Sequence, residues 1–478
     1  MVYVMNTMVN EKGLTFKDFE KKTFEMICKA GQEYTREFLE KYDTYLMENR
    51  DKASYRNKGK RKTTIKTVYG EVEYERRVYE VVRDDGLKEF VYLLDEQLEI
   101  PCIGLISMNM AEQMVSSITE MSYRDTANEI TEKTGQSISA MGVWNVIQGL
   151  GEKVCEEEQE LVRAYKAGQI QGEKESPVLF EETDGVYVKL QKEKQKKAEI
   201  KIGLAYDGWK KTGKDRYMLD GKVVVAGFSN SKDFQDYREA SIAEKYNLDE
   251  TELRIMNADG SEWIKNICDV ETMFQLDPFH RNKAINENVP YPEHASKIHE
   301  LLNKHRIDEM FRYLEIYRDS LTEDDEIEKA TGLITYFEHN RSGLIPYNER
   351  GIKIPENKNN LEYRNMGTME NHVWSVIAKR MKHNHTCWSY KGGNNLAKIL
   401  AKKCSGRLNE VAQRLKMPVF ESKIANIIEK EILSAAEVNK KVGKGYEYPV
   451  KSSLLYLNVS NKGSARQMWA SFAGDMEM

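Results

Sequence analysis

Alternating apolar and polar positions predict a series of strands in the middle of the chain. Residues 176–188 alternate with a period of two and are rich in β-branched and aromatic side chains, which is typical of a strand. Ser231 is a suitable N-cap for a helix, with Asp233 in its first turn. We expect strands at 176–188, 196–206, 222–228, 253–260 and 273–277, and helices at 231–246 and 261–265.

Acidic residues lie at the ends of two of these strands and at the start of a later helix. Asp184 ends the run of the first strand, Asp259 closes the fourth, and Glu370 opens a helical stretch over 369–381. Three strands, a helix, a strand, a helix and a strand is the order of the ribonuclease H fold, in which the first and fourth strands are neighbours. We therefore expect Asp184 and Asp259 to meet at one edge of the sheet although 75 residues separate them (259 − 184), with Glu370 beside them.

Carboxylates in this arrangement suit divalent metal ions. Mg²⁺ takes oxygen ligands, and two such ions about 4 Å apart can clamp the attacking and leaving oxygens of a displacement at phosphorus. A chain with 77 acidic residues offers many isolated Asp-Gly turns and helix-start glutamates, so one such position carries little information. The order of the three positions is what predicts metal-dependent cutting and joining of DNA.

Short motifs around these acids resemble a family of mobile-element enzymes. The motifs are Asp184-Gly185, Ala258-Asp259-Gly260, the run Asp-Pro-Phe-His-Arg-Asn-Lys at 277–283 and the run Gly-Thr-Met-Glu-Asn at 367–371. Together they look like the DDE transposases of bacterial insertion sequences. The best match is the Lre-type insertion-sequence family, which is related to the Mutator-like transposases and was long catalogued as uncharacterised proteins. The resemblance covers roughly residues 10–430.

The resemblance implies a role for each acid. Asp184, Asp259 and Glu370 would form the catalytic triad and bind Mg²⁺ or Mn²⁺. His280, in the Asp-x-x-His motif that begins at Asp277, would be an auxiliary residue near the scissile phosphate or a support for the site. The enzyme would cut a phosphodiester at the ends of its own element and then direct the freed 3′-hydroxyl at target DNA.

Positive charge is concentrated in two stretches, although the formal net charge is −5. Residues 50–66 carry eight Lys or Arg against one Asp, and residues 371–403 carry seven and no acid. Phosphate contacts depend on local charge, so both stretches are candidate DNA-binding segments, with a solvated charged surface as the alternative. The candidate contacts are Lys58, Lys60, Arg61, Lys62, Lys379, Arg380 and Lys382.

The N-terminal third has the pattern of a DNA-binding module. Residues 10–50 are helical in character, and residues 62–79 alternate around Gly70, which predicts a β-hairpin with a basic edge. Two further helical segments surround a turn at Thr134-Gly135 and predict a helix-turn-helix over 122–147.

The second helix of that motif would lie in a major groove. It would present Ser139 and Asn145 to the bases. Helical hairpins are common, so a purely structural role for the two helices is the alternative.

Composition indicates an intracellular protein. Six scattered cysteines without a Cys-x-x-Cys pair favour reduced thiols. Because the chain has neither a signal peptide nor an 18-residue apolar run, we expect it in the cytoplasm, and at the nucleoid when bound to DNA. No Gly-rich phosphate loop occurs, so no nucleotide cofactor is expected. Zinc held by His383, His385 and Cys387, or by Cys268 with His280, is a weaker alternative, because structural zinc sites use four ligands in spaced pairs.

These segments together predict a multidomain α+β protein with a ribonuclease-H-like catalytic core, built on a mixed five-stranded sheet with helices. Apolar residues near helical spacing over 294–340 predict a helical insertion before Glu370. The expected regions are 1–100 (helix and basic hairpin), 101–175 (helix-turn-helix and linker), 176–284 (first part of the core), 285–365 (helical insertion), 366–405 (last part of the core) and 406–478 (C-terminal region).

The expected function is that of a DDE-type DNA transposase. It would bind double-stranded DNA, both transposon ends and target, as a homo-oligomer and without a membrane. One alternative is a catalytically inactive or domesticated DNA-binding regulator, and another is a ribonuclease-H-like nuclease without strand transfer. The intact acids argue against the regulator, because a protein that only binds DNA gains nothing from three carboxylates facing phosphate.

Overall fold

The computed structural model describes most of the chain up to residue 413. It covers residues 15–82, 86–98, 100, 106–135, 137–265, 272–357, 359–383 and 386–413. All of these lie in one unit of the chain, residues 1–418. In these ranges no helix combines the length and the apolar character that crossing a membrane requires. The predicted C-terminal region lies outside the described residues from residue 414 onward.

A long helix and a three-stranded sheet form the N-terminal part of the unit. The helix begins at a capping box, in which the Thr15 hydroxyl accepts from Asp18 N and the Asp18 carboxylate accepts from Thr15 N. Gly70 has a φ of 141° at the turn of the hairpin, where a Cβ would collide with the Gln32 side chain. The predicted helix and hairpin are confirmed. They are α2 (Phe16–Asn49), β1 (Arg56–Thr67), β2 (Gly70–Val82), β3 (Lys88–Val91) and α3 (Leu93–Gln97).

Three helices follow and contain the predicted helix, turn and helix. Gly135 ends one of them with a φ of 67°, a left-handed conformation that glycine adopts without strain. Ser139 caps the next, because its hydroxyl accepts from Gly142 N. That helix is longer than expected and continues to Lys166. The helices are α4 (Met108–Ile118), α5 (Tyr123–Thr134) and α6 (Ala140–Lys166).

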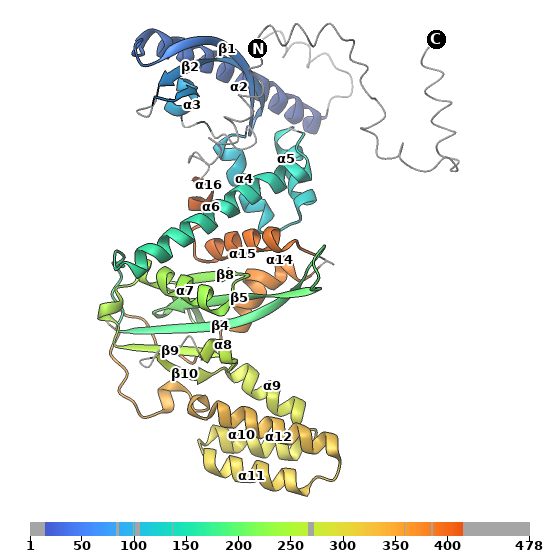
Figure 1. Cartoon of the computed structure of the whole chain (residues 1–478). Helices are drawn as coiled ribbons and strands as arrows, with labels where there is room; N and C mark the ends of the chain where they lie inside the picture. Colours follow the sequence, from blue (N-terminus) through green and yellow to red (C-terminus); the bar gives the residue numbers. More distant parts are fainter. Residues whose placement is uncertain are drawn as a thin grey trace. The chain divides into compact units, whose positions relative to one another are not determined.

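A mixed five-stranded sheet follows in the chain (Figure 1). Its strand order is β10-β9-β4-β5-β8, with β4 antiparallel to β5 and parallel to β9. Thr183 lies opposite Ala258, so Asp184 and Asp259 each directly follow one residue of this pair. The predicted contact between the first and fourth strands is confirmed. The strands are β4 (Val178–Lys189), β5 (Lys197–Tyr206), β8 (Val223–Gly227), β9 (Leu253–Ala258) and β10 (Thr272–Leu276).

An additional hairpin occupies the stretch where the sequence predicted only a turn at Asp207-Gly208. Trp209 and Glu362 exchange backbone hydrogen bonds of 2.9 Å, which tie this hairpin to the segment that precedes Glu370. The predicted helices between the strands are present, but Asn230 rather than Ser231 caps α7, because the Asn230 side chain accepts from Asp233 N. The connecting elements are β6 (Gly208–Gly213), β7 (Arg216–Asp220), α7 (Ser231–Lys245), η1 (Leu248–Glu250) and α8 (Glu262–Lys265).

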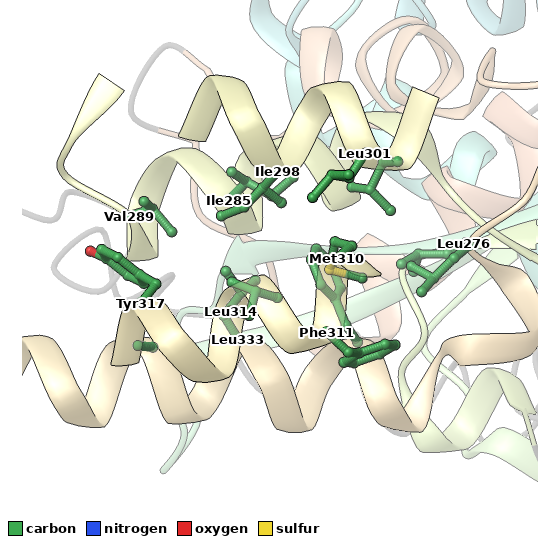
Figure 2. Close-up of a cluster of buried hydrophobic side chains, with 14 residues drawn as sticks. Leu276, Ile285, Val289, Ile298, Leu301, Met310, Phe311, Leu314, Tyr317 and Leu333 are labelled. Carbon is green, nitrogen blue, oxygen red and sulfur yellow. The ribbon is translucent and has the colours of Figure 1, made fainter. Parts of the chain in front are cut away.

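The predicted helical insertion has a hydrophobic core of its own (Figure 2). Ile298, Met310 and Leu314 are buried between its helices, and Leu276 at the end of β10 joins the same cluster. Ile316, which the helical spacing had placed with these residues, is 69% exposed. The elements are α9 (Pro278–Asn288), α10 (Pro292–Asn303), α11 (Ile307–Ser320), α12 (Asp324–His339), η2 (Arg341–Gly343) and η3 (Tyr347–Glu349).

The chain then returns to the sheet. Gly151 of α6 meets the following helical region closely, because a Cβ at Gly151 would lie 2.3 Å from the Cβ of Asn395. The helix that carries Asn395 packs against both α6 and β8. The elements are α13 (Met369–His372), η4 (Val373–Ala378), α14 (Lys379–Met381), α15 (Tyr390–Cys404) and α16 (Leu408–Gln413). The described chain is thus a mixed α+β protein.

Candidate active site

Asp184 lies inside β4, the middle strand of the sheet, and is 8% exposed. The prediction that Asp184 ends this strand is wrong, because β4 continues to Lys189. Its Oδ1 accepts a hydrogen bond of 2.7 Å from the backbone N of Gly185. The pKa of Asp184 is raised to about 6, mainly by burial and also by the charges of Asp259 and Glu370, whereas the hydrogen bond from Gly185 and the charge of His280 lower it. The negative charge of Asp184 is therefore poorly compensated, and it is sensitive to both other predicted acids.

Asp259 directly follows β9 and is half-buried. Its carboxylate accepts hydrogen bonds from the backbone N of Ser261 at 2.8 Å and from the Ser261 hydroxyl at 2.7 Å. The Tyr336 hydroxyl of α12 donates to the Asp259 carbonyl at 2.7 Å. These contacts fix the turn at the end of β9, so the carboxylate has a defined position at the sheet edge.

Glu370 lies in the first turn of α13 and is exposed. Within the described ranges its carboxylate has neither a hydrogen-bond nor an ion-pair partner. The helix continues as a π-helical segment, Val373–Ala378, directly after α13. Short π-helical segments inside α-helices are frequent at functional sites.

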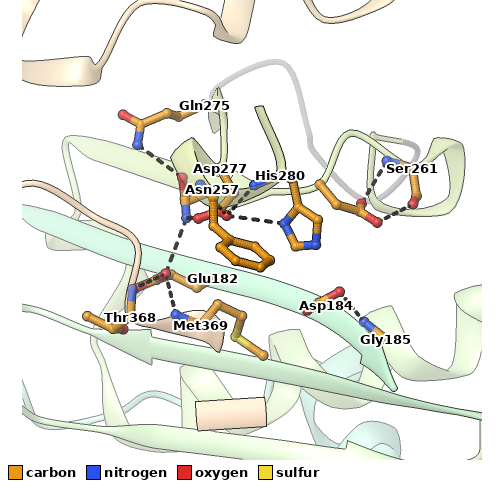
Figure 3. Close-up of polar contacts among 12 residues, drawn as sticks. Glu182, Asp184, Gly185, Asn257, Ser261, Gln275, Asp277, His280, Thr368 and Met369 are labelled. Atoms are coloured by element: carbon orange, nitrogen blue, oxygen red, sulfur yellow. Dashed lines mark hydrogen bonds and ion pairs between the residues drawn. The ribbon is translucent and has the colours of Figure 1, made fainter. Parts of the chain in front are cut away.

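The three predicted acids share one region of the molecule without forming a closed cage. Asp259, Glu370 and His280 all affect the pKa of Asp184, so their charges lie near it. Figure 3 shows Asp184 and His280 in the same part of the site. In the described part of the chain, however, no three His, Cys, Asp or Glu side chains are gathered closely enough to hold a metal ion. The structure therefore brings the acids into electrostatic contact but not to ligand distance.

Asp277 and His280 form a dyad at the start of α9 (Figure 3). Asp277 Oδ2 caps the helix by accepting from the backbone N of Phe279 and His280, and it lies 3.1 Å from His280 Nδ1. Burial by itself lowers the pKa of His280, but the hydrogen bond to Asp277 and the charge of Asp184 raise it above its ordinary value. The Asp-x-x-His spacing thus allows one carboxylate to cap α9 and to hold the His280 ring near the acids.

A buried glutamate, Glu182, connects the strand of Asp184 to the helix of Glu370. Glu182 is 0% exposed. Its Oε2 accepts from the backbone N of Thr368 at 2.9 Å and of Met369 at 3.0 Å, and its Oε1 accepts from the Thr368 hydroxyl at 2.6 Å (Figure 3). The Tyr206 hydroxyl donates to Oε1 at 2.8 Å. These bonds fix the residues immediately before Glu370.

The same network extends to His280. The Asn257 side-chain amide donates to Glu182 Oε2 at 3.2 Å and to Asp277 Oδ1 at 2.8 Å. The Gln275 amide donates to Asn257 Oδ1 at 3.0 Å. Residues of β4, β9, β10 and α9 are thus linked beneath the acids. The sequence reasoning missed Glu182, Asn257 and Gln275; the only available signal was a second acid two residues before Asp184, on the same side of the strand.

The neighbouring residue, Glu181, points to the opposite face of β4 and has a structural role. Its carboxylate pairs with Arg254 at 2.7 Å and with Arg238 at 3.2 Å. Glu239 pairs with the same two arginines, at 2.9 and 2.6 Å. This buried network holds α7 against β4 and β9, and it contains none of the predicted site residues.

The predicted DNA contacts of the hairpin lie on a ladder of opposite charges. Lys58 pairs with Glu80 at 2.6 Å, Lys60 with Glu75 at 3.6 Å, and Lys62 with Glu73 at 3.3 Å. The three lysines of β1 are therefore each compensated from β2.

Arg61 differs from the lysines of the ladder. It is exposed and lies opposite Arg76 in the β1–β2 register. Within the described ranges Arg61 has no acidic partner.

The two predicted residues of the helix-turn-helix have different roles. Ser139 is the N-cap of α6, so its hydroxyl is already used by Gly142 N. Asn145 is exposed on the first turns of α6, beside Trp144, which is 39% exposed, and near Met141, which is 64% exposed. Asn145 is accordingly the better placed of the two for a contact outside the chain.

Most of the basic stretch after Glu370 is used inside the protein. Lys379 pairs with Glu120 at 2.7 Å, and the buried Arg380 donates from Nε to the Ile118 carbonyl at 2.8 Å. Arg380 therefore has no free surface for DNA, contrary to the expectation from the sequence. Lys382 remains exposed.

The later lysines of this stretch also face acids. Lys391 pairs with Glu152 at 2.7 Å and Lys398 with Glu158 at 2.5 Å, both across α15 and α6. Basic residues of 371–403 thus pair with acids elsewhere in the chain: Glu152 and Glu158 of α6, and Glu120, which follows α4.

The alternative zinc sites receive no support from the described residues. His385 and Cys268 lie outside the described ranges, and Cys387 is an exposed free thiol.

Comparison with known proteins identifies relatives over most of the chain. A family model described as Uncharacterised protein family (UPF0236) matches residues 9–416. The UPF0236 protein TTE2489 of Caldanaerobacter subterraneus subsp. tengcongensis is 25% identical over 431 residues, 86% of this chain and 83% of the relative. Another UPF0236 protein of that organism, whose name joins eleven TTE designations, is 25% identical over 421 residues, 84% of this chain and 80% of the relative.

Proposed function

This chain belongs to the Uncharacterised protein family UPF0236, and we propose that it is a DDE-type DNA transposase with a ribonuclease-H-like catalytic core. The observation that carries the proposal is the parallel pairing of β4 with β9, which makes neighbours of the strands that lead to Asp184 and Asp259. The order β8-β5-β4-β9-β10 is also the strand order of a ribonuclease H sheet. Glu370 supports the proposal because its charge reaches Asp184.

The chemistry of the acids fits a hard divalent ion. Asp184, Asp259 and Glu370 supply only oxygen, which suits Mg²⁺ or Mn²⁺, and the raised pKa of Asp184 indicates a carboxylate short of positive charge. The acids are not gathered at ligand distance in the described residues, so Asp259 would exchange its contacts with Ser261 for the ion. A bound ion would supply activation of the attacking oxygen, whether of water or of a 3′-hydroxyl.

The names of the relatives support a mobile element. One UPF0236 protein carries eleven designations from a single organism, and another carries four. Several loci that share one protein name are what an element leaves when it copies itself within a genome. A regulator of one operon gives no reason for such multiplicity.

The helix-turn-helix formed by α5 and α6 supports binding to duplex DNA. Asn145 is exposed near the start of α6, which is where recognition helices contact base edges. Arg61 on the hairpin and Lys382 beyond α14 are exposed cations suited to phosphate contacts. We propose that these residues hold the element ends while the acid site cuts.

Cleavage of DNA that flanks the coding region tests the proposal. Full-length protein with Mg²⁺ or Mn²⁺ should nick such DNA at defined positions and join the new 3′-hydroxyl to a second duplex. Asp184→Asn, Asp259→Asn and Glu370→Gln should each lower cleavage by at least ~10²–10³ while DNA binding is retained. Asp215→Asn, which changes an exposed acid between β6 and β7, should cut like the wild type.

Other outcomes identify the alternatives. Cutting without joining would favour a ribonuclease-H-like nuclease. Tight binding of the flanking DNA without cutting, with either ion, would favour the DNA-binding regulator and contradict the transposase. Near-normal cleavage by one acid variant would remove that residue from the proposed triad.

A further inference from the structure

Helix α2 carries a second apolar stripe that is separate from the face packed on its own hairpin. The inward face includes the buried Cys28 and Leu39. The second stripe consists of large side chains that remain accessible to solvent. They are Phe24 (50% exposed), Ile27 (59%), Tyr34 (75%), Phe38 (47%) and Tyr45 (57%).

The spacing of the stripe is that of a coiled coil. Its five members follow one another at intervals of 3, 7, 4 and 7 residues, so all occupy the a and d positions of a seven-residue repeat. Apolar residues that repeat every 3.5 positions make the seam of two supercoiled helices. Gly31 and Lys41 fill the two remaining positions of the repeat between Phe24 and Tyr45. At Gly31 the stripe borders the face packed on the hairpin, because a Cβ there would lie 3.2 Å from the Tyr69 ring. The stripe therefore fits a second helix better than a flat surface or a loop.

From this pattern we propose that α2 is a dimerisation helix, and that the stripe is covered by α2 of a second copy of this chain in an antiparallel coiled coil. The same stripe on both copies is self-complementary, as a two-fold interface requires. The inference does not depend on the proposed function, because it concerns a surface outside the acid site.

The charges along α2 select the antiparallel direction. Residues 17–29 contain four Lys and three acids, a net of +1. Residues 33–48 contain two basic residues and five acids, but Asp43 is buried and paired with Arg77, so the others have a net of −2. An antiparallel pair sets the positive half of each helix beside the negative half of the other. A parallel pair would set the two negative halves together, where like charges repel.

The area of the stripe suits a modest dimer. Large aromatic side chains bury about 150–250 Å² when fully covered, so the four half-exposed aromatic residues together with Ile27 give roughly 500 Å² per copy. Two copies then reach about 1,000 Å², the lower limit for a specific interface. We therefore expect dissociation in the micromolar range rather than an obligate dimer.

Sedimentation of the full-length protein tests the interface. Wild-type protein should be dimeric at tens of micromolar (about 10–100 μM) and dissociate on dilution. The double variant Ile27→Glu with Tyr34→Glu should be monomeric at the same concentrations, with a dissociation constant raised at least ~100-fold. Both residues are exposed, so far-UV circular dichroism and the thermal midpoint should match the wild type.

A matched control excludes a general effect of added charge. Ile316→Glu on α11 changes an isoleucine that is 69% exposed, close to the 59% of Ile27, and it should leave dimerisation unchanged. A monomeric wild type at every concentration would overturn the proposal. An equal loss in the control and the double variant, or no loss in the double variant, would also overturn it.

A charge reversal tests the direction of the helices in the same assay. Glu37→Lys with Glu48→Lys makes the C-terminal half of α2 positive. In the antiparallel arrangement the variant should dimerise more weakly, because positive halves then face each other, and added salt should reduce the difference. Tighter dimerisation would overturn the antiparallel arrangement in favour of a parallel one.

Discussion

The contact between α6 and α15 and the acid site around Asp184 both contain several charged side chains, but only the first pairs them with opposite charges. Across α6 and α15, Lys398 and Glu158 are 2.5 Å apart, with side chains 7% and 9% exposed. At the acid site, Asp184 is similarly buried, and its pKa is raised to about 6, mainly by burial and also by the charges of Asp259 and Glu370. One region pairs opposite charges, and the other collects like charges.

The difference separates structure from chemistry. Buried ion pairs hold elements together, and breaking one is costly because it leaves an uncompensated charge. Acids that repel one another destabilise the fold, and perturbed acids of this kind are common at functional sites, where a ligand or ion relieves the repulsion. Glu182, two residues from Asp184, is intermediate: burial and the charge of Asp277 raise its pKa as well, but its carboxylate accepts five hydrogen bonds that tie neighbouring elements together.

The largest effect on stability should follow from replacing Glu182. Glu182→Ala leaves the donors of Thr368, Met369, Tyr206 and Asn257 unpaired in a buried site, and each such group costs about 1–3 kcal/mol. We expect the free energy of unfolding to fall by at least ~4 kcal/mol, and by about 1–2 kcal/mol for Glu182→Gln, which keeps one acceptor. Urea unfolding followed by fluorescence measures both values. Equal urea midpoints for Glu182→Ala and the wild type would show that the hydrogen bonds to Glu182 do not stabilise the fold.

A smaller loss is expected at the contact between α6 and α15. Lys398→Met leaves Glu158 buried without its partner and should cost about 3 kcal/mol. Adding Glu158→Leu should restore most of this loss, because a well-packed apolar pair often replaces a buried ion pair at little cost. A double-mutant cycle from the same unfolding curves gives the coupling between the two residues. If the two substitutions changed the free energy of unfolding additively, the ion pair between Lys398 and Glu158 would not be what stabilises this contact.

At the acid site, removing a charge should raise the free energy of unfolding rather than lower it. The folded-state pKa of Asp184, about 6, lies above its ordinary value of 3.8, so the folded protein binds more protons than the unfolded chain between these values. The wild type therefore loses stability as pH rises through this window. Asp184→Asn, which cannot ionise, should be the more stable protein at neutral pH by up to about 3 kcal/mol.

The pH dependence of that difference is the decisive measurement. Thermal midpoints without divalent ions should diverge between about pH 4 and pH 7, with Asp184→Asn above the wild type, and then stay parallel. A difference that is constant with pH, or a variant less stable than the wild type at pH 7, would show that the Asp184 charge is compensated. Mg²⁺ should reduce the difference in thermal midpoint between Asp184→Asn and the wild type, because the ion should stabilise only the wild type.

Local patterns were sufficient for much of the fold. Period-two runs gave the five strands within a few residues, and apolar spacing gave the insertion whose core includes Ile298 and Leu314. The adjacency of β4 and β9 followed from element order. These features depend on which side of an element is buried, and alternation along the sequence records that directly.

Contacts between distant residues could not be predicted in this way. Thr368 and Glu182 are 186 positions apart, so nothing near Glu182 distinguishes it from an exposed acid such as Glu193. The lysines over 379–403 had the composition of a DNA-binding surface, yet the glutamates that pair with them lie 239 to 283 positions earlier, Glu152 for Lys391 and Glu120 for Lys403. A charge in a sequence has a meaning only once its partner is known.

The smallest effect on folding stability should follow from changes in the hairpin. There, lysines that are paired with glutamates can be compared with Arg61, which has no acidic partner among the described residues, for their contribution to DNA binding. Lys60→Gln with Lys62→Gln removes two exposed ion pairs with Glu75 and Glu73, and such pairs contribute about 0–1 kcal/mol to folding. Because each lysine already faces a glutamate, we expect the variant to lose less affinity for duplex DNA than Arg61→Gln does. Arg61→Gln should reduce the slope of log affinity against log salt concentration by up to about 0.9, the value for one phosphate contact. Fluorescence anisotropy with duplex DNA measures the affinity and its salt dependence. The salt concentration should range from roughly 50 to 200 mM, around physiological ionic strength. A larger loss for the lysine variant would show that DNA displaces the glutamates, and that the ladder opens on binding.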